Sequence, residues 1–283
     1  MPKKQPEITK SMMEQYLTFL REEERSEATL RKYTHDLMAF LDFVKDQALN
    51  KSLVIAWKEA LTAAHAPASV NSMLAAVNGF LKFQGWVELC VRPLKIQRSL
   101  FLEEKKELTK GEYRRLVEAA ERGENERLAL VMQTICATGI RVSELKFITV
   151  ESLQSGRAEI RNKGKWRVVF LPGKLRKVLK KYAQRQKRTA GAVFVTRTGK
   201  PLDRSNIWRD MKALCNSAGV DPEKVFPHNL RHLFARTFYS MEKDLGRLAD
   251  ILGHSSINTT RIYTAESGSV HAAQMERLGL VVT

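Results

Sequence analysis

Residues 227–264 read PHNLRHLFARTFYSMEKDLGRLADILGHSSINTTRIYT, and this stretch carries the strongest signal of fold and function in the chain. Its first six residues open a helix, and a spacing of three places His228 and Arg231 on one helical face. His254 follows in a second box, LGHS, and Tyr263 stands nine residues beyond it. We expect these four side chains to belong to one site.

A second arginine lies upstream, in residues 137–145, ATGIRVSEL. Gly139 is typical of a helix end, so Arg141 follows a helix break and starts the next helix. The planar guanidinium groups of Arg141 and Arg231 suit the non-bridging oxygens of a phosphodiester. They would neutralise the charge of a pentacoordinate transition state without a metal. We therefore expect neither a metal ion nor a cofactor.

A tyrosine hydroxyl can attack phosphorus and form a covalent phosphotyrosine, which conserves the bond energy for rejoining. A phenol has an ordinary pKa of about 10, so Tyr263 needs a base, and His228 is the candidate. The departing sugar oxygen needs an acid. Lys163 and Lys165 lie in a predicted hairpin turn, and either can supply that proton.

Each of these residues alone also has an ordinary structural interpretation. Arg141 is typical of a solvated helix start, His228 of a helix N-terminal residue paired with a carboxylate, and Tyr263 of a packed core. The two turn lysines are typical of an exposed sheet edge. Their joint occurrence, in this order and at these spacings, favours one shared site.

These boxes, the tyrosine and ATGIRVSEL make the sequence resemble the tyrosine site-specific recombinases, the group of Xer resolvases, phage and transposon integrases and Cre. Ser26, Tyr33 and Phe40 follow the pattern of that family's N-terminal core-binding domain, so the resemblance covers nearly the whole chain. It implies a SAM-like helical N-terminal domain and a catalytic domain that grip duplex DNA as a C-shaped clamp.

The resemblance also implies individual roles. Arg141 and Arg231 resemble the two phosphate-binding arginines, and His228 resembles the base partner in the same box. His254 resembles the histidine that hydrogen-bonds the scissile phosphate, and Tyr263 resembles the nucleophile.

For the hairpin lysine, Lys163 matches the family better than Lys165. Asn162 replaces a glycine that is frequent there, which leaves room for either lysine. His232 resembles a second histidine of its box that is structural rather than chemical. The implied assembly is a homotetramer on two DNA sites, with a possible accessory DNA-bending or directionality protein. The tail 270–280 is either a helix donated to a neighbouring protomer or a self-packed terminal helix.

Composition limits the class of protein. The 283 residues carry a formal net charge of +17, which indicates a polyanionic partner, nucleic acid first. The odd number of cysteines, three, and the absence of a CxxC motif argue against a disulfide framework and against a structural zinc site. The motifs GxxxxGK[ST], HExxH and GxSxG are absent. Without a secretion signal or a run of about 18 apolar residues, we expect a cytoplasmic, nucleoid-associated protein with no membrane partner.

Charge and periodicity predict two domains in a mainly α chain with a small β-hairpin. Residues 1–100 carry a net charge of +3, and the rest carry +14. Eight basic side chains lie within residues 174–188, and we expect some of them to contact phosphates. The predicted division is a helical core-binding domain at 1–98, an exposed linker at 99–107, and a catalytic domain with a tail helix at 108–283.

Local signals place the elements. Ser11 begins a capping box for the first of four N-terminal helices, and Ser26 caps the second. A capping box at Thr109 opens the catalytic domain, and residues 158–171 form the hairpin. Further helices are predicted at 127–138, from 142, and at 174–188, 205–218, 229–241, 244–252 and 256–263.

The predicted function is a metal-independent DNA strand transferase that integrates or excises a mobile element through a 3′-phosphotyrosine and a Holliday junction. Residues 238–243, FYSMEK, differ from the sequence that is common at this place in Xer proteins, which favours the mobile element over an Xer-like chromosome-dimer resolvase. Two other hypotheses are a DNA-binding regulator on the same scaffold without chemistry, and a relaxing type IB topoisomerase that needs no tetramer.

Overall fold

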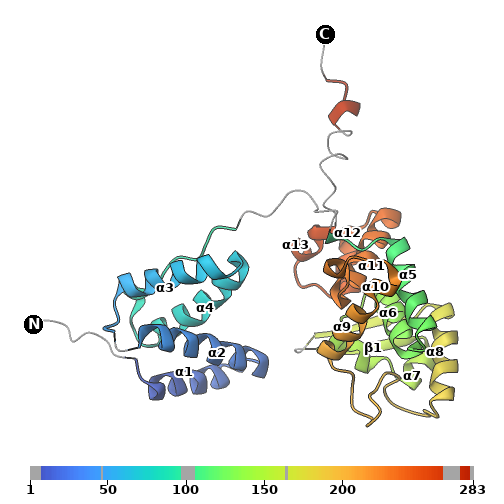
Figure 1. Cartoon of the computed structure of the whole chain (residues 1–283), viewed down its shortest axis with the longest axis horizontal. Helices are drawn as coiled ribbons and strands as arrows, with labels where there is room; N and C mark the ends of the chain where they lie inside the picture. Colours follow the sequence, from blue (N-terminus) through green and yellow to red (C-terminus); the bar gives the residue numbers. More distant parts are fainter. Residues whose placement is uncertain (1–7, 46, 97–105, 163–164, 264–274, 281–283) are drawn as a thin grey trace, which may run out of the picture. The chain divides into compact units, whose positions relative to one another are not determined.

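The computed structural model describes residues 8–45, 47–96, 106–162, 165–263 and 275–280, without the side chains of Asn162 and Lys165. The chain divides into two compact units, Met1–Arg98 and Ser99–Thr283, and each has its own hydrophobic core. Helices dominate both units, and the described strands form a single two-stranded sheet (Figure 1). The mainly α fold with a small hairpin is thus confirmed. No helix within the described ranges has both the length and the apolar character that a bilayer crossing requires.

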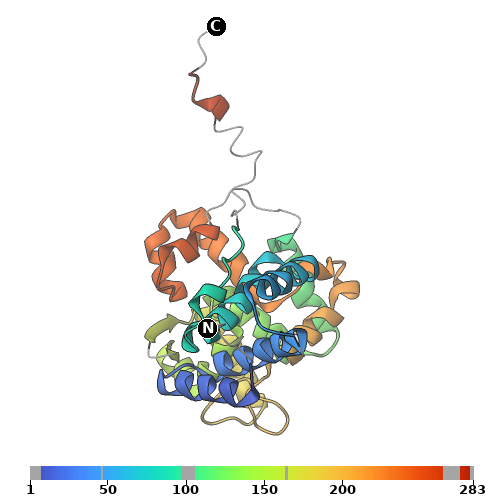
Figure 2. The same cartoon turned by 90° about the vertical axis from the view of Figure 1, so that its left-hand side faces the viewer.

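The first unit is a bundle of four helices. α4 packs against each of the other three, and their apolar stripes meet in one core (Figure 1 and Figure 2). Phe40 and Phe80 are almost completely buried there. The elements are α1 (Lys10–Glu22), α2 (Glu27–Val44), α3 (Lys51–Ala64), α4 (Pro67–Phe83) and the short 3₁₀ helix η1 (Val87–Leu89).

Side-chain caps fix where these helices begin. Thr9 caps α1, because its hydroxyl accepts a hydrogen bond of 3.3 Å from the amide of Met12. The predicted box at Ser11 is therefore wrong, since the helix already includes that residue. Ser26 caps α2 as predicted.

The second unit consists of short helices around a hairpin. The predicted capping box at Thr109 is confirmed at the start of α5. The predicted helix at 205–218 is divided at Leu214, and the helix expected from Val142 is a 3₁₀ segment. The elements are α5 (Lys110–Arg122), α6 (Glu126–Thr138), η3 (Val142–Phe147), α7 (Val150–Ser155), β1 (Arg157–Asn162), β2 (Lys165–Phe170), α8 (Gly173–Arg185), α9 (Arg204–Ala213), α10 (Cys215–Ala218), η4 (Pro222–Lys224), α11 (Pro227–Glu242), α12 (Leu245–Leu252), α13 (Ile257–Thr260) and η5 (Arg261–Tyr263).

The hairpin is antiparallel, with Asn162 paired to Lys165 beside the turn. Its faces follow the two-residue period of a strand. Ile160 and Val169 are buried in the core, whereas Trp166 on the other face is 60% exposed. The predicted hairpin is confirmed, and its register determines which side chains face the core.

Two helix ends meet α11. α6 ends before Gly139, which has a φ of 65°, and α12 ends before Gly253, which has a φ of 64°. A Cβ on Gly139 would lie 2.5 Å from the ring of Phe234 on α11. Glycine is needed there for the left-handed backbone and for the close crossing. The crossing brings the main-chain carbonyls of these helix ends to Arg231.

The described residues that precede and follow the segment between the units each contact a helix of their own unit. Asn71 and Asn78 on α4 exchange hydrogen bonds with the main chain of Leu94 and Val91. Glu107, expected in an exposed linker, instead lies partly buried against α11.

Candidate active site

Arg141, Arg231, His254 and Tyr263 converge where the ends of α6 and α12 meet α11. Arg231 lies within hydrogen-bonding distance of His254, and the ring of His254 stacks on that of Tyr263. Arg141 reaches the same α12 terminus from the start of η3. The structure therefore brings together four of the six predicted site residues.

Arg231 anchors this cluster and is only 1% exposed. One terminal nitrogen donates to the carbonyl of Gly139, and the other donates to that of Leu252 at 2.7 Å. Both carbonyls lie at helix C-termini, whose partial negative charge favours a cation. Burial and the nearby charge of Arg141 lower the pKa of Arg231 to about 10, so it stays cationic at neutral pH. Its Nε is buried without a hydrogen-bond partner in the described part of the chain.

Glu144 joins Arg141 to a third arginine, Arg167 on β2. Its two carboxylate oxygens lie 3.1 Å from Arg141 and 2.6 Å from Arg167, and the side chain is 1% exposed. Sequence reasoning missed both partners. The spacing of three between Arg141 and Glu144 was an available signal. Arg167 was not predictable, because its inward direction depends on the register of the hairpin.

His254 links the arginines to the start of α13. Its Nε2 lies 3.0 Å from Arg231, and its Nδ1 lies 2.8 Å from the hydroxyl oxygen of Thr260. Because a guanidinium only donates, Nε2 is the acceptor in this pair and the ring proton belongs on Nδ1. Burial and the charge of Arg231 lower the pKa of His254 to about 4, so the ring is neutral at neutral pH.

His228 lies in the first turn of α11, at the edge of the cluster. Desolvation of the ring, together with His232 and Arg231, lowers its pKa to about 4. A neutral imidazole can accept a proton. The ring of His228 contacts His232 at 4.6 Å between centroids, and it is His232 that contacts Tyr263.

Tyr263 ends η5 and is 4% exposed. Its ring meets His232 edge-on, with centroids 5.1 Å apart, and stacks on His254 at 6.2 Å. Burial raises the pKa of the phenol, although the charges of Arg231 and Arg141 act in the opposite direction. The same arginines would stabilise the phenolate once a base removed the proton.

The predicted general acid lies in the hairpin turn. Lys163 falls outside the described residues, and the side chain of Lys165 is likewise not described. Among the described residues, no group of three or more histidine, cysteine, aspartate or glutamate side chains is placed to hold a metal ion. The cluster can bind a phosphodiester through its arginines and offers it a buried phenol.

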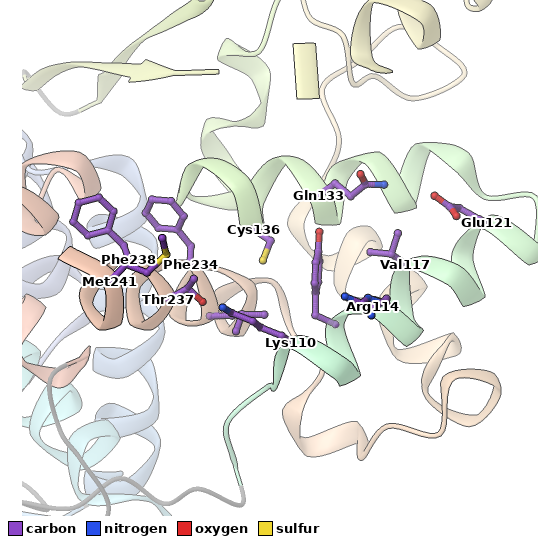
Figure 3. A pocket seen from close by; sticks show the side chains of 12 residues that line it. Lys110, Arg114, Val117, Glu121, Gln133, Cys136, Phe234, Thr237, Phe238 and Met241 are labelled. Atoms are coloured by element: carbon purple, nitrogen blue, oxygen red, sulfur yellow. The ribbon is translucent and has the colours of Figure 1, made fainter. Parts of the chain in front are cut away.

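A separate groove of about 590 Å³ lies between α5, α6 and α11 (Figure 3). Phe234 and Phe238 line it from α11, Cys136 from α6, and Lys110 and Arg114 from α5. None of the predicted site residues that the structure describes belongs to its lining. This groove is therefore distinct from the arginine cluster.

Comparisons with known proteins extend over both units. Residues 106–269 match the model of the Phage integrase family, and residues 13–86 match the Phage integrase, N-terminal SAM-like domain. Tyrosine recombinase XerA of Pyrococcus furiosus is 29% identical over 97% of this chain and 96% of that protein. Tyrosine recombinase XerD of Xanthomonas campestris pv. campestris is 31% identical over 71% of this chain and 69% of that protein.

Solved structures show the same fold. XerH site-specific recombinase bound to difH substrate in a pre-cleavage complex is 21% identical, with a TM-score of 0.67, over 87% of this chain and 78% of that one. A lambda integrase tetramer bound to a Holliday junction is 18% identical, with a TM-score of 0.72, over 89% of this chain and 76% of that one. The expected pairing of a SAM-like domain with a catalytic domain is confirmed.

Proposed function

Because the chain belongs to the phage integrase family and is a tyrosine recombinase, we propose that it cleaves and rejoins duplex DNA through a 3′-phosphotyrosine intermediate and a Holliday junction. The observation that carries the proposal is the buried phenol of Tyr263 beside Arg231 and His254. A phenol held next to cations in a protein of high net positive charge suits attack on a phosphodiester.

In this mechanism the phenolic oxygen of Tyr263 attacks the scissile phosphorus, and His228 takes the phenolic proton. The bond from phosphorus to the 5′ oxygen breaks, and Lys163 gives that oxygen a proton. A 5′ hydroxyl from the partner strand then attacks the phosphotyrosine and releases Tyr263. With a pKa of about 4, the ring of His228 is unprotonated at neutral pH and can accept a proton, but the same low pKa makes it a weak base.

Arg141 and Arg231 bind the non-bridging oxygens, and His254 hydrogen-bonds the same phosphate. Both guanidinium groups are fixed before DNA arrives, by helix-end carbonyls and by Glu144. Fixed cations stabilise the pentacoordinate transition state without reorganisation. We expect full activity in EDTA for this reason.

We further propose that the two units grip duplex DNA from opposite sides, as a clamp, and that four protomers act on two DNA sites in the cytoplasm at the nucleoid. The DNA complex of XerH and the tetramer of lambda integrase support this assembly. The tail docks on a neighbouring protomer. Its Met275, Leu278 and Leu280 are exposed, which suits such a contact.

Two biological roles share this chemistry. The sequence of residues 238–243 favours integration and excision of a mobile element, whereas the similarity to Xer recombinases favours chromosome-dimer resolution. The DNA that the protein captures decides between them. Ends of a neighbouring mobile element support the first role, and a single chromosomal site supports the second.

The direct test is covalent capture. The protein is incubated in EDTA with nicked suicide duplexes drawn from the DNA that flanks its gene and is then denatured. Mass spectrometry locates the residue that carries covalently bound DNA. We expect a DNA adduct on Tyr263. Tyr263→Phe should abolish the adduct and leave DNA affinity nearly unchanged, because only the nucleophile is lost. An adduct that survives Tyr263→Phe would overturn the assignment, and tight binding with no wild-type adduct would favour the DNA-binding regulator.

The general acid is tested separately. Lys163→Ala should slow cleavage far more than Lys165→Ala, because the first lysine is the proposed proton donor. When sulfur replaces the 5′-bridging oxygen of the DNA, the 5′ thiolate leaves without protonation. Such a DNA should therefore rescue Lys163→Ala selectively. Rescue of Lys165→Ala instead would reassign the acid to the other side of the turn.

A further inference from the structure

His232 and Glu107 form a contact chain that ends on Tyr263. His232 lies one residue after Arg231 on α11, and its ring meets that of Tyr263 at an interplanar angle of 79°. Its Nδ1 lies 3.6 Å from a carboxylate oxygen of Glu107. Both side chains are mostly buried, at 20% and 16% exposure, so solvent screens their interaction only weakly.

Glu107 also pairs with Arg236 on α11. Its second carboxylate oxygen lies 2.9 Å from Arg236, which also donates to the carbonyl of Leu108 at 2.8 Å. Burial raises the pKa of Glu107, but the interaction with His232 and the charge of Arg236 outweigh burial and lower it overall. The carboxylate is therefore charged at neutral pH and orients the Nδ1–H of His232 toward itself.

Among the described residues, Glu107 is the charged partner of the His232 imidazole. Its Nε2 is buried without a hydrogen-bond partner among the described residues. The ring orientation therefore depends on the pairing with Glu107 and on the aromatic contacts with His228 and Tyr263. The other ring that contacts Tyr263, His254, is fixed by Thr260 and Arg231.

We propose that Glu107 and His232 are positioning residues that hold the ring of Tyr263 for in-line attack, and that they set the rate of strand cleavage without contributing to DNA affinity. The inference rests on the proposed role of Tyr263 as nucleophile. Glu107 contacts neither the phenol nor an arginine of the phosphate cluster in the described residues, so it positions the ring through His232, while its charge also raises the pKa of Tyr263.

The test measures single-turnover cleavage of the captured suicide duplex at saturating DNA, with Kd measured in parallel. Glu107→Gln and His232→Gln should each slow cleavage about 10- to 100-fold, the cost of misplacing a reacting group by roughly 1 Å. Kd should stay within about twofold, and Glu107→Asp should regain part of the rate. The double variant should be no slower than the slower single variant, because both changes break one contact chain.

Glu112→Gln is the matched control. Glu112 is 13% exposed and pairs with Lys224 at 2.8 Å, so the same change removes a paired carboxylate away from Tyr263. It should leave the cleavage rate within about twofold of wild type. Wild-type rates in Glu107→Gln, or multiplicative losses in the double variant, would overturn the inference while the Tyr263 adduct still supports the proposed function.

A second measurement needs no DNA. In protein labelled with 3-fluorotyrosine, the ¹⁹F resonance missing from Tyr263→Phe identifies Tyr263. That resonance should move in Glu107→Gln and in His232→Gln, and should stay in place in Glu112→Gln. An unchanged resonance in the first two variants would overturn the positioning contact even if no DNA substrate were found.

Discussion

At the scale of the residue, the groups that bind the three arginines of the site neutralise only part of their positive charge. Arg231 donates to two main-chain carbonyls, which carry only partial charge. Arg141 and Arg167 share the single carboxylate of Glu144. Net positive charge therefore remains for an anionic ligand, and the phosphate does not have to displace a full counter-charge.

His254 makes this arrangement sensitive to acid. Its folded-state pKa of about 4 lies below the ordinary value of 6.5, so the unfolded chain binds more protons between these values. Its contribution to stability is complete above pH 6.5 and is lost as the pH falls toward 4. We expect the urea midpoint of wild type to fall across this window and that of His254→Asn to fall less steeply. Parallel curves would show that His254 titrates normally in the folded protein.

Residue spacing in the sequence was sufficient to group Arg231, His254 and Tyr263, because one short run of helices carries all three. It was not sufficient for Arg167 or Glu107. Their contacts depend on where a strand and a segment distant in sequence meet α11 and η3, and no local periodicity encodes that meeting. His232 was assigned a structural role from the family resemblance alone, and its contact with Glu107 was not predicted.

At the scale of the element, the C-terminus of α12 supports the arginine cluster. Gly253 has a φ of 64°, and a Cβ there would lie 2.5 Å from Cδ of Arg167. Gly253→Ala should cost about 1–2 kcal/mol from the left-handed backbone. The displaced Arg167 should add about 1–3 kcal/mol and slow cleavage, because its ion pair with Glu144 is broken. Urea unfolding and the capture assay measure the two effects.

Gly219→Ala is the control that separates the cost of backbone strain from the cost of displacing Arg167. Gly219 has a φ of 58°, and nothing lies within 4 Å of a Cβ built there. This variant should lose only the backbone cost and keep its cleavage rate. Equal losses of stability in the two variants would mean that Arg167 moves aside freely.

The element boundaries show what sequence signals resolve. The capping boxes at Thr109 and Ser26 were predictable because the side chain and its target amide are three residues apart. The start of α1 was not, because Thr9 and Ser11 are both good caps and only the position of the whole helix in the bundle selects one.

At the scale of the whole molecule, most of the positive charge belongs to the second unit. On α8, Lys177, Lys180 and Lys181 are exposed, whereas Arg176 donates to carbonyls of α7 and is structural. We expect DNA affinity to fall about 10³- to 10⁵-fold between roughly 50 and 200 mM salt, the range for six to ten phosphate contacts. Replacing the three lysines by alanine should make the slope of log Kd against log salt shallower. An unchanged slope would place α8 outside the DNA footprint.

The main-chain partners of Arg231 bear on how this protein tolerates mutation. Every amino acid supplies the same carbonyl oxygen, so replacing the side chain of Leu252 removes no partner of Arg231. The constraint falls instead on the torsion angles of the two glycines that end α6 and α12. Lineages can therefore diverge widely in sequence around the guanidinium, provided that two backbone turns are inherited intact.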